Sequence, residues 1–192
     1  MIKRIAGGMM MTTVLLYACQ QPAPKQADGE GVVATLQAPY ADVFYDSLNV
    51  AVQSYYELTD ALVKADSVRA DLSAVQLKQH LDSLPVQQTG ADSTRIVQLK
   101  EAAGSISAEL AGLVGEKDLE GKRTSFQMVS DMLFDLVKTT GLKGKTVYRQ
   151  YCPMAFNDQG AYWLSDKEEI LNPYFGDKML HCGDVTDTLS YK

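Results

Sequence analysis

The stretch PYADVFYDSLNVAVQSYYELTDAL, residues 39–62, decides the fold class. Its apolar side chains recur at alternating steps of four and three residues, which is the spacing of one face of an α-helix. The side chains of this face are Phe44, Leu48, Ala51, Tyr55, Leu58 and Leu62. Pro39 suits the first turn, because the N–H that proline lacks would have no helical partner there. The stretch therefore predicts a long amphipathic helix that buries one face.

Residues 66–85, 92–115 and 118–141 carry helix signals of the same kind. Each stretch begins at an aspartate or serine that can cap a helix N-terminus, and each ends at a proline or glycine. The side chains predicted to face the core are Val68, Leu72, Val75, Leu77, Leu81, Leu84, Ile96, Leu99, Ala103, Ile106, Leu110, Leu113, Leu119, Phe126, Val129, Leu133 and Leu136. Short connections make consecutive helices antiparallel. We therefore predict a mainly α fold, a four-helix up-and-down bundle.

The C-terminal tail, residues 145–192, differs from the helices in composition: it is aromatic and rich in Pro, Gly and Asn. Val147–Phe156 and Ala161–Leu164 predict a small hairpin about the Asn-Asp-Gln-Gly turn between them. Ser165 and Glu168 form a capping box, which predicts a short helix that ends before the following Asn-Pro. The aromatic side chains expected to pack the tail onto the bundle are Trp163, Tyr174 and Phe175. The tail is otherwise predicted to be irregular.

The N-terminal segment has the features of an export signal. Lys3 and Arg4 precede the apolar residues 5–18, which is the layout of a secretory signal peptide. The apolar run is too short for a membrane span, which needs about 20 such residues. It ends in Leu-Tyr-Ala-Cys19, which resembles the bacterial lipobox, where a small residue precedes the cysteine that is acylated. We therefore predict removal of residues 1–18 and a lipid anchor on Cys19.

The composition after Cys19 predicts a tether and argues against nucleic acid. Residues 19–36 are rich in Gln, Pro, Ala and Gly without an apolar period, so we expect a lipidated flexible tether there and a folded domain over residues 37–192. Removal of Lys3 and Arg4 from 18 basic side chains leaves 16, against 24 acidic ones, a formal charge of −8. Such a protein lacks the basic stripe that phosphate binding needs. The expected partner is a membrane, reached through the lipid.

The sequence carries no enzyme signature. It has no CxxC pair, no HExxH, no Gly-rich phosphate loop and no G-x-S-x-G elbow. The two histidines, His80 and His181, have no catalytic motif around them. His80 lies in a polar part of its helix, where we expect it to face solvent. We therefore predict a protein that is not an enzyme.

Sulfur-bearing residues mark both ends of the tail. Pro153 favours extended backbone at Cys152, so the alternate residues Cys152 and Met154 are expected on the same side. Met179 and Cys182 share a face if their turn is helical, because they are three residues apart. Two thiolates and two thioethers form a soft ligand set, which selects Cu(I) over hard cations. The predicted metal ligands are Cys152, Met154, Met179 and Cys182, with His181 as a borderline addition.

A second interpretation of the same cysteines stays open. With Cys19 acylated, only Cys152 and Cys182 keep free thiols, and an exported protein meets an oxidising compartment. A disulfide between them would stabilise the fold by roughly 3 to 4 kcal/mol in the chain-entropy model. Met154 and Met179 would then fill gaps in the core, as methionine commonly does.

Three motifs between residues 147 and 185 carry a family resemblance: Y-x-x-Y-C-P-M-A, G-A-Y-W-L-S and N-P-Y-F-G-D-K-M-L-x-C-G. They resemble the domain of unknown function 3347 family, whose helical domain occurs in stand-alone lipoproteins and on periplasmic adaptor subunits of copper and heavy-metal efflux pumps. The Tyr-Cys-Pro-Met run also resembles the start of small heavy-metal-binding modules, although Ala155 stands where those modules carry His. The resemblance implies copper or other soft-metal handling.

Two functions are therefore expected as alternatives. The first is a periplasm-facing lipoprotein that binds Cu(I) and passes it to an efflux-system subunit. The second is a non-catalytic interaction domain that docks on an envelope or efflux protein and is held by a Cys152–Cys182 disulfide. By resemblance to lipoproteins of two-membraned bacteria, we expect the cell envelope as the location, at the outer membrane and facing the periplasm.

Overall fold

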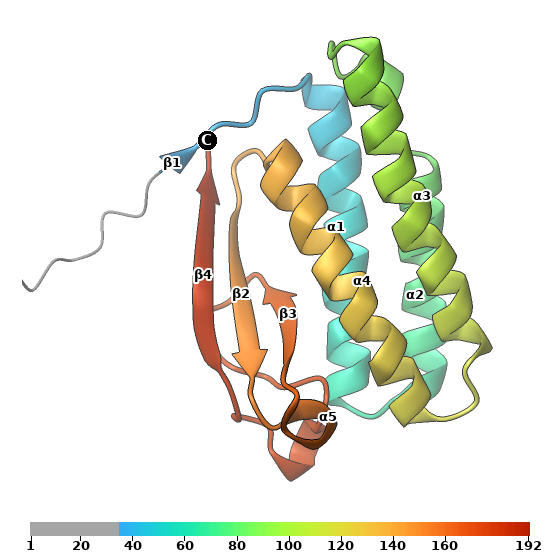
Figure 1. Cartoon of the computed structure of the whole chain (residues 1–192), viewed down its shortest axis with the longest axis vertical. Coiled ribbons are helices and arrows are strands. Elements are labelled where there is room, and N and C mark those ends of the chain that lie inside the picture. The colour runs from blue at the N-terminus through green and yellow to red at the C-terminus, as the bar shows by residue number, and fades with distance from the viewer. Residues whose placement is uncertain (1–34) are drawn as a thin grey trace, which may run out of the picture. The chain divides into compact units, whose positions relative to one another are not determined.

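The computed structural model describes residues 35–192 (Figure 1). The predicted signal segment, Cys19 and the tether up to residue 34 lie outside the described residues. Four long helices follow one another: α1 (Asp42–Val63), α2 (Ser67–Asp82), α3 (Ser93–Gly115) and α4 (Leu119–Thr140). Consecutive helices run antiparallel and contact each other, which confirms the predicted mainly α fold. Among residues 35–192, no helix is both long and apolar enough to cross a membrane.

Three helices begin at the predicted capping residues, whereas α1 begins at Asp42, after the start predicted from Pro39. Asp66, Asp92 and Asp118 precede α2, α3 and α4, and each side chain accepts a backbone N–H three residues on, at 3.0, 2.9 and 2.8 Å. Such a bond satisfies one of the N–H groups that a helix N-terminus leaves unpaired. Gly141 ends α4 with a φ of +80°, and a Cβ there would lie 2.9 Å from Gln37 O. Only glycine fits this turn without strain.

Helix α2 corrects the predicted core. Three side chains predicted to face inward are exposed, at 72, 62 and 39%: Val68, Leu72 and Val75. Leu77, Leu81 and Leu84 are buried as predicted, but the first half of the helix packs through Ala70 and Ala74 instead. Alanines let neighbouring helices approach closely, so the larger apolar side chains marked the wrong face. His80 was also expected to face solvent, but it is half-buried, and its Nδ1 lies 3.0 Å from Ser54 Oγ of α1.

A four-stranded sheet packs beside the bundle (Figure 1). Its strands are β1 (Thr35–Leu36), β2 (Thr146–Cys152), β3 (Ala161–Ser165) and β4 (Asp184–Tyr191), in the order β1-β4-β2-β3. β2 pairs antiparallel with β3 and with β4, and β1 pairs parallel with the end of β4. The predicted β2–β3 hairpin forms, but its first strand ends at Cys152 and not at Phe156. β4 was not predicted, and β1 takes in two residues that were expected to belong to the tether.

The remaining elements are short: η1 (Val86–Gln88), α5 (Ala155–Asp158) and η2 (Gly176–Lys178). The helix predicted from the capping box at Ser165 does not form. Ser165 Oγ accepts the Lys167 N–H at 3.0 Å and closes a local turn. The carbonyl oxygens of Lys167, Glu168 and Glu169 instead accept hydrogen bonds from the buried Gln150 side-chain amide. A tertiary contact from β2 therefore takes the acceptors that helical backbone bonds would have used.

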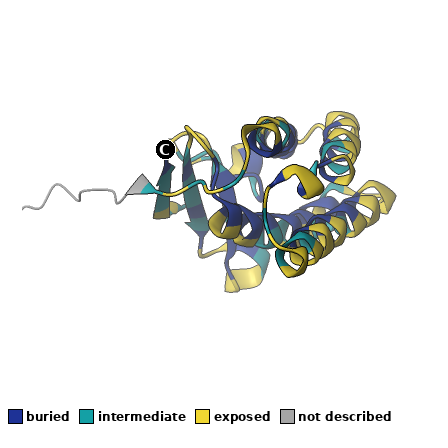
Figure 2. Ribbon diagram, turned by 90° about the horizontal axis from the view of Figure 1, so that it is seen from above, coloured by how far each residue is buried: buried dark blue, intermediate teal, exposed yellow. Residues whose placement is uncertain are grey.

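Aromatic side chains join the sheet to the bundle. The buried Tyr55 hydroxyl of α1 lies 2.7 Å from Ser130 Oγ of α4 and accepts the Leu164 N–H of β3 at 3.0 Å. The Arg149 guanidinium of β2 lies between the rings of Phe134 and Tyr162, 4.0 and 3.8 Å from their centroids. Trp163 and Tyr174 are buried as predicted, and Phe175 packs against the core. Figure 2 shows buried residues on the faces that the elements turn toward one another. The sheet is therefore part of the same core.

Candidate functional site

The structure brings the two thiols of the tail together. Cys152 is the last residue of β2 and is fully buried. Cys182 lies in the loop between η2 and β4 and is partly exposed. Thirty residues separate them in sequence, but their Sγ atoms are 3.1 Å apart, and both thiols are free.

A tight loop positions Cys182 against β2. Gly183 follows it with a φ of +145°, and a Cβ there would lie 2.8 Å from Tyr151 O and 2.9 Å from the Trp163 ring. Only a glycine lets the chain pass this close. The fully buried Asn172 fixes the other side of the loop, because its side-chain amide donates to Cys182 O at 2.7 Å. The loop therefore holds the Cys182 backbone from both sides.

The other predicted ligands make no hydrogen bond to either thiol within residues 35–192. Met154 is 47% exposed in a turn after β2, and not on extended backbone beside Cys152 as expected. His181 Nδ1 lies 2.9 Å from Ile170 O. Met179 O accepts the Cys182 N–H at 3.1 Å, which is the three-residue turn that their spacing suggested. The same part of the chain contains no cluster of three or more His, Cys, Asp or Glu side chains suited to a metal ion.

The turn after Cys152 has a strained backbone. Three successive residues have left-handed φ values of 53, 57 and 64°: Phe156, Asn157 and Asp158. Each such residue other than glycine costs roughly 1 to 2 kcal/mol. The Phe156 ring packs edge-on against Tyr174, 5.3 Å between centroids, and so helps to hold the turn. Strained backbone often lies at functional sites, and here it adjoins the thiol pair.

The proximity of the sulfurs changes the acidity of the Cys182 thiol. The hydrogen bond with Cys152 is the largest cause that raises the pKa of the Cys182 thiol to about 11, and desolvation and the charges of Cys152 and Asp184 add to it. At neutral pH the Cys182 thiol therefore keeps its proton. A metal ion or an electrophile must displace that proton before it can bind the sulfur.

The separation of the sulfurs suits two kinds of chemistry. A disulfide needs about 2.05 Å between them, so the pair has to close by about 1 Å. A tetrahedral ion that has two further ligands and bonds of about 2.3 Å to both sulfurs holds them roughly 3.8 Å apart, so the pair has to open by less than 1 Å. Small movements of the Cys182 loop therefore reach either state.

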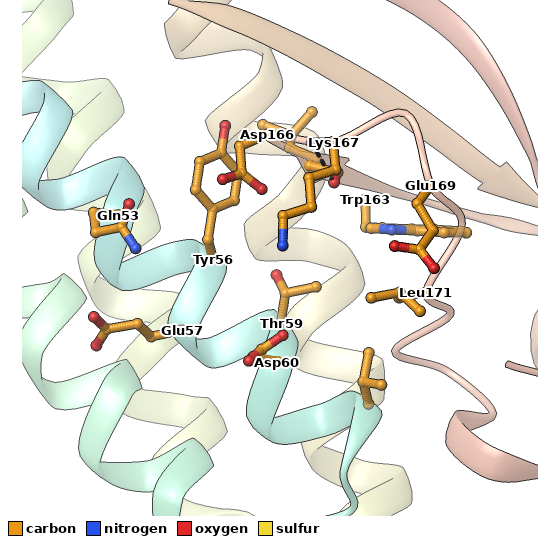
Figure 3. Close-up of a pocket in the computed structure, with 13 residues that line it drawn as sticks. Gln53, Tyr56, Glu57, Thr59, Asp60, Trp163, Asp166, Lys167, Glu169 and Leu171 are labelled. Atoms are coloured by element: carbon orange, nitrogen blue, oxygen red, sulfur yellow. Dashed lines mark hydrogen bonds between the residues drawn. The ribbon is translucent and has the colours of Figure 1, made fainter.

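A separate hollow of about 160 Å³ lies between α1 and the loop after β3 (Figure 3). Lys167 extends its ammonium group into this hollow near Tyr56 and Thr59. Four acidic side chains also line it: Glu57, Asp60, Asp166 and Glu169. Desolvation, with the nearby charge of Asp166, raises the pKa of Tyr56. The hollow is smaller than the roughly 300 to 1,000 Å³ of usual small-molecule sites. No spacing in the sequence marked these residues, because they come from two distant segments.

A family model matches most of the helical bundle. Residues 51–145 match the model of a family described as "Protein of unknown function (DUF3347)". No curated protein and no solved structure matches the chain. The matched segment runs from within α1 to the residue before β2, so it covers the bundle except the first part of α1. The tail, whose motifs suggested this family, follows the matched segment and contains both thiols.

Proposed function

Because this chain contains a DUF3347 domain over residues 51–145, and the tail that follows brings two thiols together, we propose that it binds a soft metal ion, Cu(I). The proposed site is Cys152 and Cys182. One observation carries the proposal: the 3.1 Å approach of two sulfur atoms that lie thirty residues apart. The proposed role is to bind and transfer the ion, without catalysis.

The ligand chemistry favours a soft monovalent ion over zinc. A closed structural zinc site takes four ligands, usually Cys and His, whereas this site offers two thiols. Thiolates and thioethers are soft ligands and select Cu(I). Met154, Met179 and His181 belong to the proposal as further ligands from the same tail. The partly exposed Cys182 gives a donor or an acceptor protein access for exchange of ligands one at a time.

The cellular setting of the proposal comes from the sequence. We infer a lipid anchor on Cys19, a position at the outer membrane facing the periplasm, and an efflux-system subunit as the acceptor of the ion. The supporting observations are the signal-like segment before Cys19 and the resemblance of the tail motifs. The acidic composition supports the absence of nucleic acid among the partners.

The 3.1 Å distance between the two sulfurs also supports a second function, that of a docking module held by a disulfide. Closure of the pair by about 1 Å gives a disulfide, which would make the tail a stapled module that docks on an envelope or efflux protein. In this case the thiols would be oxidised in the working protein and would bind no metal.

Native mass spectrometry of the chain from Gln20 onward separates the two functions. The protein is reduced, kept anaerobic and titrated with Cu(I) beside a Cys152→Ala, Cys182→Ala double variant. A Met128→Leu variant serves as a control for thioethers elsewhere, because Met128 is 53% exposed on α4. We expect one copper ion on the wild type and on the control, and none on the double variant. No copper on the wild type, with an untreated mass two hydrogens below the reduced mass, would support the staple.

A further inference from the structure

We propose that the thiol pair is a redox switch that closes by thiol–disulfide exchange with a small disulfide, Cys182 being the entering thiol and Cys152 the resolving thiol. The inference rests on the proposed function in one respect: closure removes both sulfurs from the proposed copper site. The assignment of the two roles depends only on the geometry of the pair.

The two cysteines differ in access. Cys152 is fully buried, and its backbone pairs with Ala161 of β3. Cys182 is partly exposed in a loop outside the strands. An external disulfide can therefore reach the Cys182 sulfur, whereas reaching Cys152 would require the strand end to open. Cys182 is therefore the thiol that attacks the external disulfide first.

The second step follows from the distance. Cys152 Sγ lies 3.1 Å from Cys182 Sγ, so a mixed disulfide on Cys182 has an attacking sulfur beside it. The Cys182 loop is already held by Asn172 at Cys182 O and by the tight passage at Gly183. Little conformational entropy is therefore lost when the Cys152–Cys182 bond forms, which favours the internal disulfide over two mixed disulfides.

The exchange balances in two steps. Cys182 gives up its proton and attacks one sulfur of the external disulfide; the Cys182–sulfur bond forms, and the other sulfur leaves as a thiolate that takes up a proton. Cys152 then gives up its proton and attacks the Cys182 sulfur, which releases the second external thiol. The two cysteines lose two electrons and two protons, and the external disulfide gains them as two thiols. Excess thiol reverses both steps.

Single variants test the roles. The full chain with Cys19→Ala, which leaves Cys152 and Cys182 as the only thiols, is mixed with oxidised glutathione and followed by mass spectrometry. A Cys152→Ala variant should accumulate one stable glutathione adduct. A Cys182→Ala variant should form an adduct at least tenfold more slowly. Equal rates for the two variants, or a faster reaction at Cys152, would overturn the assignment.

The parent chain tests the switch without dependence on the folding of a variant. Quenched samples should contain a transient adduct that peptide mapping places on Cys182, followed by a form two hydrogens lighter. An adduct mapped to Cys152, or no closure in any glutathione buffer, would overturn the proposal. Copper uptake by the reduced and closed forms is measured separately. Closure with the expected roles but no copper on the reduced form would refute the proposed function alone, whereas copper uptake without closure would refute the switch alone.

Discussion

The substitution Gly183→Ala should move Cys182 away from Cys152. The added Cβ would lie 2.8 Å from Tyr151 O and 2.9 Å from the Trp163 ring, at a φ of +145° that side chains rarely adopt. Strain at such a backbone position costs about 1 to 3 kcal/mol and overpacking about as much again, so we expect the free energy of unfolding to fall by about 2 to 6 kcal/mol. The loop can relieve part of this by lifting off β2, which separates the sulfurs.

Gly144→Ala is the matched control. Gly144 also has a positive φ, +71°, but an added Cβ would meet nothing within 4 Å. The free energy of unfolding of this variant should fall by only about 1 to 2 kcal/mol, from backbone strain alone. Urea unfolding measures the stability, and equilibration in glutathione buffers measures the closure constant of the pair. That constant should fall at least tenfold in Gly183→Ala if about 1.4 kcal/mol of the strain passes to the loop, and stay unchanged in the control. Equal behaviour of the two variants in both assays would refute the reasoning.

Three further predictions concern acidity, the buried hydroxyl and α2. Because the pKa of the Cys182 thiol is raised to about 11, its alkylation rate should keep rising above pH 9. The folded state should lose stability over the same pH range, because the unfolded thiol gives up its proton at a lower pH. An alkylation rate that levels off near pH 9 would contradict this prediction. Tyr55→Phe leaves the Leu164 N–H unpaired and should cost about 2 kcal/mol in urea unfolding, whereas Tyr56→Phe should cost less than about 0.5 kcal/mol. Leu77→Ala should cost about 2 to 5 kcal/mol and Leu72→Ala less than about 0.5 kcal/mol, because Leu77 is buried and Leu72 is 62% exposed; similar losses would contradict this placement of Leu72.

The helices could be predicted because their signals are local. An aspartate cap and a glycine or proline stop act within one helical turn, so Asp66, Asp92 and Asp118 locate three helix starts. The inward face of α2 is not a local property. It depends on which stripe the neighbouring helices cover, and the stripe through Ala70 and Ala74 has too little apolar area to stand out in the sequence.

The tail was harder to predict because its order depends on contacts with distant residues. The capping box at Ser165 is a valid local signal, but the Gln150 side chain takes the carbonyl groups that follow it. β4 carries polar residues along much of its length, such as Asp184 and Asp187, so its pairing with β2 and β1, and not an apolar pattern, makes it a strand. The choice of Cys152 and Cys182 was possible from sequence because no other cysteine follows residue 19. Their different exposures became evident only in the fold, and the copper site stays a prediction.

β1 and the thiol pair lie at opposite ends of the sheet. β1 pairs with the last residues of β4, and Ser190 there faces Thr146, the first residue of β2, whereas Cys152 is the last. Seven residues of strand span roughly 20 Å. The thiol pair therefore lies about one strand length away from the point where the chain enters the sheet. A partner protein can approach Cys182 at this end of the sheet without contacting β1.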